Sequence, residues 1–305
     1  MDPEPRAILK PYAFLTTILF VLVFSANYFY KNKPTVQQTV PTLQKTFVVS
    51  GTVVSEKKEH PPSRKKKKTI YLSFDDGPNK GTEQVINIVN EQQIPVTLFI
   101  IGEHVYASRL QAGIYDSILK SNWIEIANHS YSHALGNKFR KFYTMPDSVV
   151  KDFKRCADSL QLKSNIVRTP GRNIWRTSTV TCTDIKLSTE AADSLRGAGF
   201  DVVGWDLEWH FTSDLKAVQS SEELSNQVDS MFTLSKTKTP DHLVLLAHDQ
   251  VFANSKDAAS LKAFIETIKQ KNDYDFAMIK DYPGLGKKLL GDSVVLTNNS
   301  LLLIK

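Results

Sequence analysis

Two carboxylates stand side by side in the segment SFDDGP, where Asp75 and Asp76 follow the apolar run TIYLSF. Adjacent like charges repel each other, and a partly buried pair is costly unless a positive group lies close to both. Neighbouring side chains of a strand face opposite ways, but Gly77-Pro78 breaks the strand at once, so both aspartates can turn inward. The motif therefore predicts a site at which a positive group lies beside the pair.

A pair of histidines in NHSYSH, His129 and His133, is the candidate for holding that positive group. On a helical turn, residues spaced i and i+4 project from one face, and two imidazoles placed in this way suit one metal ion. One added carboxylate gives two His and one Asp, which leaves coordination positions open for water, as a catalytic metal site needs. We therefore expect one aspartate to bind the cation and the other to stand beside the water.

Short apolar strands alternate with amphipathic helices through the body of the chain. The expected strands are residues 69–74, 94–102, 123–130, 165–171, 201–209 and 242–249. The expected helices are residues 81–93, 115–120, 148–161, 189–200, 222–234 and 260–270. This alternation predicts a parallel α/β fold, and its regularity favours a barrel over an open sheet.

Ionisable residues fall at the ends of the expected strands. They are Asp75, Asp76, His129, His133, Arg168, Asp206, His248 and Asp249. In parallel α/β folds, the carboxyl ends of the strands meet at one rim, and chemistry gathers there. We therefore expect these side chains to lie around one site.

The motifs SFDDGP, HSYSH, RTPG, GWDLEW and LLAHD resemble, in this order, those of the polysaccharide deacetylases (carbohydrate esterase family 4, the NodB-homology domain). The resemblance covers roughly Thr69 to Tyr282. It implies a distorted (β/α) barrel of the NodB-homology type. It also implies removal of acetyl groups from sugars, usually the N-acetyl group of glucosamine units.

The resemblance further implies how the carboxylates and imidazoles divide their roles. Asp75 would be the general base that deprotonates water, and Arg168 would hold it by a charge-assisted hydrogen bond. Asp76, His129 and His133 would bind a divalent metal, most commonly Zn²⁺, with Co²⁺, Ni²⁺ or Mn²⁺ as alternatives.

On the substrate side, the resemblance makes His248 the general acid that protonates the leaving amine. Asp206 would keep His248 protonated and oriented. Trp209 and Leu246 would form the walls of the acetyl pocket. A backbone N–H near Gly171, together with the metal, would stabilise the oxyanion.

The chain departs from the family pattern at two places, and both affect substrate preference. The family usually has an aromatic residue after the proline of its RxP motif, whereas this chain has Gly171 and then Arg172; Trp175 is the expected replacement for stacking on sugar. The motif around Asp206 is shorter than usual, so the acid that contacts the general-acid histidine stays open between Asp206 and Glu208.

Charge is distributed unevenly along the 305 residues. Residues 1–68 hold 12 Lys and Arg against 4 Asp and Glu, whereas the remaining 237 residues hold 26 against 28. A domain that binds nucleic acid needs a basic face in its folded part. We therefore do not expect nucleic acid as a partner.

The run from Tyr12 to Tyr30 carries no charge over 19 positions, which predicts a transmembrane anchor. In a helix this run would span roughly 28 Å, close to the thickness of a bilayer core. A cleaved signal peptide is the alternative, because Arg6 and Lys10 form a charged region before the run, although FSANY is a poor cleavage site.

These features divide the chain into five segments. They are a short N-terminal segment (1–11), the anchor (12–30), a basic flexible linker (31–68), the deacetylase domain (69–284) and a C-terminal extension (285–305). Residues 173–190 are interpreted as an insertion beside the site. Cys156 and Cys182 are expected to be free, buried thiols.

Together these features predict a membrane-anchored, metal-dependent deacetylase of the cell envelope. Its substrate would be an N-acetylated glycan outside the cytoplasmic membrane, either peptidoglycan or a chitin-like oligomer. One alternative is an O-acetyl esterase acting on xylan or another polysaccharide. The other is a membrane-tethered glycan-binding protein that has lost catalysis.

Overall fold

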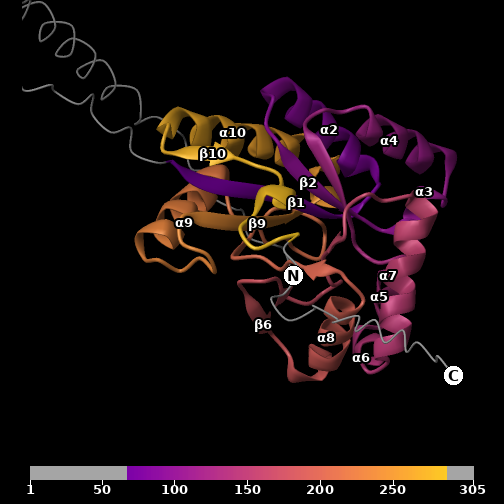
Figure 1. Ribbon diagram of the computed structural model, residues 1–305. Coiled ribbons are helices and arrows are strands. Elements are labelled where there is room, and N and C mark those ends of the chain that lie inside the picture. The colour runs from indigo at the N-terminus through magenta and orange to yellow at the C-terminus, as the bar shows by residue number, and fades with distance from the viewer. Residues whose placement is uncertain (1–66, 287–305) are drawn as a thin grey trace, which may run out of the picture. The chain divides into compact units, whose positions relative to one another are not determined.

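The computed structural model of the protein describes residues 67–286 (Figure 1). The predicted anchor, nearly all of the predicted linker and most of the C-terminal extension lie outside these residues. Within the described part, no helix combines the length and the apolar character that crossing a membrane requires.

The described residues form an α/β fold around one sheet of ten strands. The strands are β1 (Lys68–Gly77), β2 (Val96–Ile100), β3 (Ile124–Asn128), β4 (Ile166–Val167), β5 (Ile174–Arg176), β6 (Thr181–Thr183), β7 (Asp201–Val202), β8 (Leu207–Glu208), β9 (His242–His248) and β10 (Tyr274–Phe276). Their order is β6-β5-β7-β4-β3-β2-β1-β9-β8, and β10 pairs with the start of β1. The α/β class predicted from the sequence is confirmed.

The sheet is mixed and curls into a half-barrel. The distorted barrel implied by the family resemblance is therefore confirmed in part, and the expectation that all strands are parallel is wrong. The strands β5 and β6 are antiparallel, as are β5 and β7. In the described residues, β6 and β8 end the strand path and do not pair with each other. The cause lies in residues 201–209, which form two short strands instead of one: β7 pairs with β4, and β8 pairs with β9 at the far end of the path.

Helices follow the strands as the alternation predicted (Figure 1). The longer ones are α2 (Lys80–Gln92), α4 (Arg109–Leu119), α7 (Pro146–Leu160), α8 (Thr189–Gly197), α9 (Ser221–Thr233) and α10 (Ser255–Lys271). The short ones are α3 (Gly102–Val105), α5 (His133–Asn137), α6 (Phe139–Tyr143), η1 (Lys186–Ser188), η2 (Asp249–Ala253) and η3 (Ile279–Asp281). Local signals fix several starts; Asn79, for example, caps α2 in a reciprocal capping box with Thr82.

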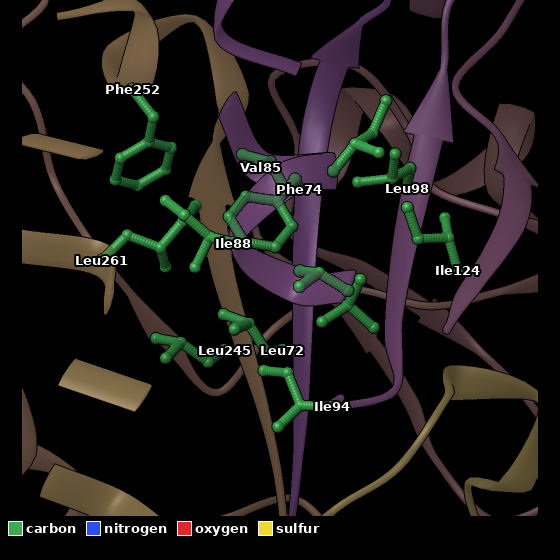
Figure 2. Packing of buried hydrophobic residues seen from close by; sticks show 14 of the residues in the cluster. Leu72, Phe74, Val85, Ile88, Ile94, Leu98, Ile124, Leu245, Phe252 and Leu261 are labelled. Atoms are coloured by element: carbon green, nitrogen blue, oxygen red, sulfur yellow. The ribbon is translucent and has the colours of Figure 1, made fainter. Parts of the chain in front are cut away.

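The alternation of side chains along β1 separates the core from the site. Ile70, Leu72 and Phe74 face outward into the largest apolar cluster, which they share with residues of α2 and α10 (Figure 2). Since successive side chains of a strand point to opposite faces, Ser73 and Asp75 face the inside of the curled sheet. The outward residues stabilise the fold, and the inward ones are left for chemistry.

The strand β9 repeats this arrangement beside β1. Leu243, Leu245 and Ala247 join the outer cluster, which leaves Leu246 and His248 on the inner face. The ladder pairs Asp75 of β1 with His248 of β9. Two residues that are 173 positions apart in the sequence therefore lie side by side at the rim.

The structure also describes the segment 173–190 and the two cysteines. The segment 173–190 forms the β5–β6 hairpin and η1, and β5 joins the main sheet. Cys156 and Cys182 are both free thiols; Cys156 is buried, as expected, whereas Cys182 is only half-buried.

Candidate active site

A cavity of about 290 Å³ lies at the carboxyl ends of the strands. It is lined by Asp75, Asp76, His129, His133, Phe139, Gly171, Trp205, Glu208, Leu246 and His248. Seven of these residues are among the site residues expected from the sequence. The structure thus brings groups from β1, the loop after β3, the segment after β4, β8 and β9 to one place.

A local irregularity at the end of β1 turns both aspartates into the cavity. Asp76 has a φ of 79°, and the register between β1 and β2 shifts between Asp75 and Gly77. Such a bulge inserts a residue and re-aims its side chain. Neighbouring residues that would face opposite sides of a regular strand therefore both line the cavity.

The positive group beside Asp75 is Arg168, which is fully buried. Its Nη1 donates to Asp75 Oδ1 at 2.9 Å and to Ser73 Oγ at 2.9 Å. Its Nε and Nη2 donate to the carbonyl oxygens of Val203 and Gly204. Burial lowers the pKa of Arg168, and the Asp75 carboxylate opposes that shift. The guanidinium is thus held on four acceptors, one of which is the candidate base.

The second aspartate lies between the two imidazoles. Asp76 Oδ1 is 3.1 Å from Nε2 of His133 and 3.5 Å from Nε2 of His129. The three possible ligand atoms all lie within 4.8 Å of one another. Asp76 Oδ1 is buried and has no hydrogen-bond partner in the described residues. A buried, unpartnered carboxylate oxygen that faces two nitrogens fits a metal ion.

The other ring nitrogens are already engaged, and this leaves Nε2 as the metal-facing atom. His129 Nδ1 lies 2.9 Å from the carbonyl oxygen of Arg168, and His133 Nδ1 lies 2.5 Å from Oδ1 of Asn137. When Nδ1–H donates to an oxygen, the lone pair of Nε2 is free to bind a metal. The donor set therefore fits a divalent cation such as zinc.

The electrostatics of the triad point the same way. Burial alone would raise the pKa of Asp76, but the imidazoles of His129 and His133 hold it well below its usual range. Burial alone would lower the pKa of His129, but Asp75 and Asp76 raise it above its usual value. Both shifts show that the two carboxylates favour positive charge at this spot, as a cation site requires.

The histidines do not converge on a helical turn, as the i, i+4 spacing suggested. Ser130 has a φ of 69°, and His133 has a φ of 46° and opens a turn of left-handed residues in α5. Side chains hold this irregular loop: Asn128 Oδ1 accepts from the Ser130 N–H, and Asp152 accepts from the next two N–H groups. The imidazoles meet because the loop is clamped, and not because a helix presents them.

Asp206 does not contact His248, so the expected pairing is not formed. The carboxylate of Asp206 instead accepts from the backbone N–H groups of Lys238 (2.7 Å) and Val244 (2.8 Å). Burial raises its pKa to about 6. His248 packs on the ring of Phe211, and its buried Nδ1 has no hydrogen-bond partner within residues 67–286. Asp206 ties strands together and does not orient the histidine.

The two tryptophans expected as substrate contacts, Trp209 and Trp175, are core residues. Trp209 packs against Phe252 and Phe264 in the outer cluster, because Glu208, its neighbour in β8, takes the inward position. Trp175 is fully buried in another cluster. Both expected substrate contacts are therefore wrong, and Trp205 is the tryptophan that lines the cavity.

Sequence comparisons identify the family to which this arrangement belongs. The sequence model of the family described as "Polysaccharide deacetylase" matches residues 63–179. This range includes the whole Asp-His-His triad together with Asp75 and Arg168. The chain belongs to the polysaccharide deacetylase family.

Curated relatives and a solved structure agree with this assignment. The polysaccharide deacetylase domain is 24% identical over 224 residues to the putative polysaccharide deacetylase YheN of Bacillus subtilis, covering 70% of this chain and 68% of that protein. Identity is also 24% over 224 residues to a peptidoglycan-N-acetylglucosamine deacetylase of Bacillus cereus, covering 70% and 71% of the two chains. Several other curated relatives match over less than a third of their own length.

The fold is similar to that of a Streptococcus mutans CE4 esterase. The two structures align with a TM-score of 0.52 and 21% identity, over 70% of this chain and 86% of the other. The likeness supports the half-barrel fold. The chain is thus an enzyme of the polysaccharide deacetylase family, with a possible metal site at Asp76, His129 and His133.

Three residues of the cavity wall were not expected there, although Glu208 was considered as a partner of the general-acid histidine; they are Glu208, Trp205 and Phe139. The position of Glu208 could have been predicted, because a strand that packs Leu207 against the outer cluster must point Glu208 inward. The position of Trp205 depends on a residue distant in sequence, because the side chain of Asn173 accepts from the Trp205 backbone N–H and donates to its carbonyl oxygen. Phe139 comes from α6, and no spacing in the sequence relates it to the site.

Proposed function

We propose that the protein is a metal-dependent hydrolase that removes acetyl groups from N-acetylated glycans. The observation that carries the proposal is the convergence, on one cavity, of the Asp76–His129–His133 triad and the Asp75–Arg168 pair. The B. cereus relative, a peptidoglycan-N-acetylglucosamine deacetylase, supports the choice of an N-acetyl substrate.

A divalent metal held by the triad would polarise the acetyl carbonyl and lower the pKa of water. Asp75 accepts the proton of the attacking water through the oxygen that Arg168 does not bond. Arg168 fixes the carboxylate by a charge-assisted hydrogen bond of 2.9 Å to its other oxygen. The water oxygen then forms a bond to the acetyl carbon, and the Asp75 carboxyl holds the released proton.

His248 supplies the proton that the leaving group needs. As the C–N bond breaks, the nitrogen takes a proton from the imidazole, and acetate and a free amine result. His248 lies across the ladder from Asp75, so the base and the acid flank the same reacting carbon. Leu246 and Trp205 of the cavity wall exclude bulk water from the acetyl methyl group.

The direct test is acetate release from acetylated glycans, with and without a chelator. Wild-type protein should release acetate, and the chelator should abolish the release until zinc is restored. Asp76→Asn and His133→Ala should be inactive and should also lose bound metal in equilibrium dialysis. Activity equal to wild type in either variant would refute the metal role, and zinc-loaded protein that binds glycan without releasing acetate would be a binding protein instead.

The choice between N-acetyl and O-acetyl substrates depends on His248. An amine leaves poorly unless it is protonated, whereas an alkoxide leaves more easily. On an N-acetyl glycan, His248→Ala should lower turnover by about 10²- to 10⁴-fold. If wild-type protein preferred an O-acetylated polysaccharide and the variant lost little on it, the protein would be an esterase.

We also propose that residues 12–30 anchor the enzyme in the cytoplasmic membrane, with the catalytic domain outside. The uncharged run of 19 residues supports this placement. Full-length protein should remain in the membrane fraction after an alkaline wash, and added protease should reach the domain in intact cells. A domain found free after processing would favour the cleaved signal peptide.

A further inference from the structure

A cluster of cationic side chains lies directly beside the catalytic cavity. It consists of Lys138, Arg140, Lys141 and Arg172, which we call the basic patch. With Asn137 and Phe139 these residues line a shallow hollow of about 470 Å³. Phe139 lines both the hollow and the catalytic cavity, so a ligand that passes Phe139 reaches both.

The cations of the basic patch lack counter-charges. None of the four forms an ion pair with an acidic residue within residues 67–286. Arg172 is held by other means: its Nη1 donates to the carbonyl oxygen of Gly171, and its guanidinium stacks near the rings of Phe139 and Tyr143. Its Nε is buried and has no hydrogen-bond partner in that part of the chain. A fixed arginine with an unused donor suits an anionic ligand.

The surrounding chain does not explain this concentration of positive charge. From residue 69 onward, the chain holds 26 Lys and Arg against 28 Asp and Glu, so the body is close to neutral. Asp184, an acid from the segment beside α6, has its two oxygens bonded to the backbone N–H groups of Asn173 and Ile185. The basic patch is therefore a local feature of the cavity rim.

We propose that the basic patch binds carboxylate groups of the glycan strand whose N-acetyl group enters the cavity. This inference rests on the proposed function and narrows it. The substrate is an anionic strand of the peptidoglycan type whose lactyl ethers carry free carboxylates in place of peptide amides, and not a neutral chitin-like chain. Arginine forks match carboxylates in two-point hydrogen bonds, and a neutral chain offers nothing to four unpaired cations.

Binding measurements test this without requiring turnover. The ligands are two oligosaccharides of equal length, built from N-acetylglucosamine alternating with N-acetylmuramic acid. One has free carboxylates, and the other has them converted to amides. The full chain is compared with Arg140→Gln/Lys141→Gln, which changes two exposed positions of the basic patch. The matched control, Lys120→Gln/Lys236→Gln, removes the same charge from exposed sites elsewhere.

Wild-type protein and the control should bind the carboxylate strand about tenfold or more tightly than the amide strand. The patch variant should lose that difference and still bind the amide strand as wild type does. Equal affinity of wild-type protein for both strands would overturn the inference, as would an equal loss in the control. Tighter binding to a phosphate-bearing glycan of the same length would also overturn it.

The same proteins separate this inference from the proposed function. Carboxylate-dependent binding without acetate release would refute the deacetylase and leave the basic patch as assigned. Acetate release at equal rates from the two strands, unchanged in the patch variant, would support the deacetylase and refute the role of the basic patch.

Discussion

The two sides of the catalytic cavity are built in different ways. On one side, Asp75 and His248 come from adjacent strands whose ladder and alternation determine where each side chain points. On the other side, His133 and Phe139 come from short turns that follow left-handed backbone, and Gly171 follows a strand of two residues. Packing of the core fixes the side-chain positions on the strand side, whereas single hydrogen bonds fix those on the loop side.

This contrast suggests a division of labour. The strand side holds the groups that move protons, which must keep a fixed position relative to the reacting atom. The loop side holds a metal ligand and the rim that meets the rest of the glycan. Loops carry such contacts because they can change without disturbing the core. Substitutions on the two sides should therefore have separable consequences.

The largest effect is expected from Asp75 on the strand side. Asp75→Asn removes the base but leaves all three metal ligands, so acetate release should fall by about 10²- to 10⁴-fold while zinc affinity stays close to wild type. Asp76→Asn, one residue later, should lose both. Kinetics and equilibrium dialysis on the two variants would show whether Asp75 and Asp76 have distinct roles. An equal loss of zinc affinity in both variants would contradict distinct roles.

A matched pair of leucines measures the difference in stability between the two sides. Leu72 is completely buried behind the strand side, whereas Leu135 is 37% exposed in the loop. Leu72→Ala should cost about 2–5 kcal/mol of unfolding free energy, since a core cavity is created. Leu135→Ala should cost less than about 0.5 kcal/mol. If denaturant titrations gave similar losses of unfolding free energy for the two variants, the strand side and the loop side would not differ in stability.

The strand side follows well from the sequence. Alternation in TIYLSF and HLVLLAH, combined with the strand break after Asp76, correctly predicts Asp75, Asp76 and His248 around one rim. The same alternation, applied to residues 207–209, would have assigned Glu208 to the cavity and Trp209 to the core. Trp209 was wrongly assigned to the acetyl pocket because residues 201–209 were treated as one strand.

The loop side was less accessible to such reasoning. The spacing of His129 and His133 indicated a shared metal but gave the wrong backbone, because the positive φ of Ser130 and the clamp from Asp152 are tertiary effects. Phe139 could not be placed, because no periodicity links it to the site. The expected contact between Asp206 and His248 was also wrong, since the Asp206 carboxylate accepts hydrogen bonds from the backbone N–H groups of Lys238 and Val244.

The role of Asp206 gives a prediction about pH. Burial raises its pKa to about 6 in the folded state, so the folded protein binds the proton more tightly than the unfolded chain. The stabilisation is full below about pH 4 and is lost as pH rises through 6, by about 3 kcal/mol at most. Asp206→Asn should flatten this part of the stability profile, and an unchanged slope would contradict the assignment.

The smallest effect on metal binding is expected from Asn137 on the loop side. Its side chain lies 2.5 Å from His133 Nδ1 and orients that metal ligand. Asn137→Ala should weaken zinc binding by about 10- to 100-fold, and Asn137→Asp, which keeps an acceptor, should retain most of it. Zinc titrations that showed equal affinity in all three proteins would mean that the loop positions His133 without this contact.

The most direct test is a crystal structure of the zinc-loaded protein with anomalous scattering data. One ion should lie about 2.0–2.2 Å from a carboxylate oxygen of Asp76 and from Nε2 of both His129 and His133, with Asp75 left uncoordinated on Arg168. An ion bound elsewhere, or three side chains pointing apart with no ion among them, would contradict the assignment of the metal site.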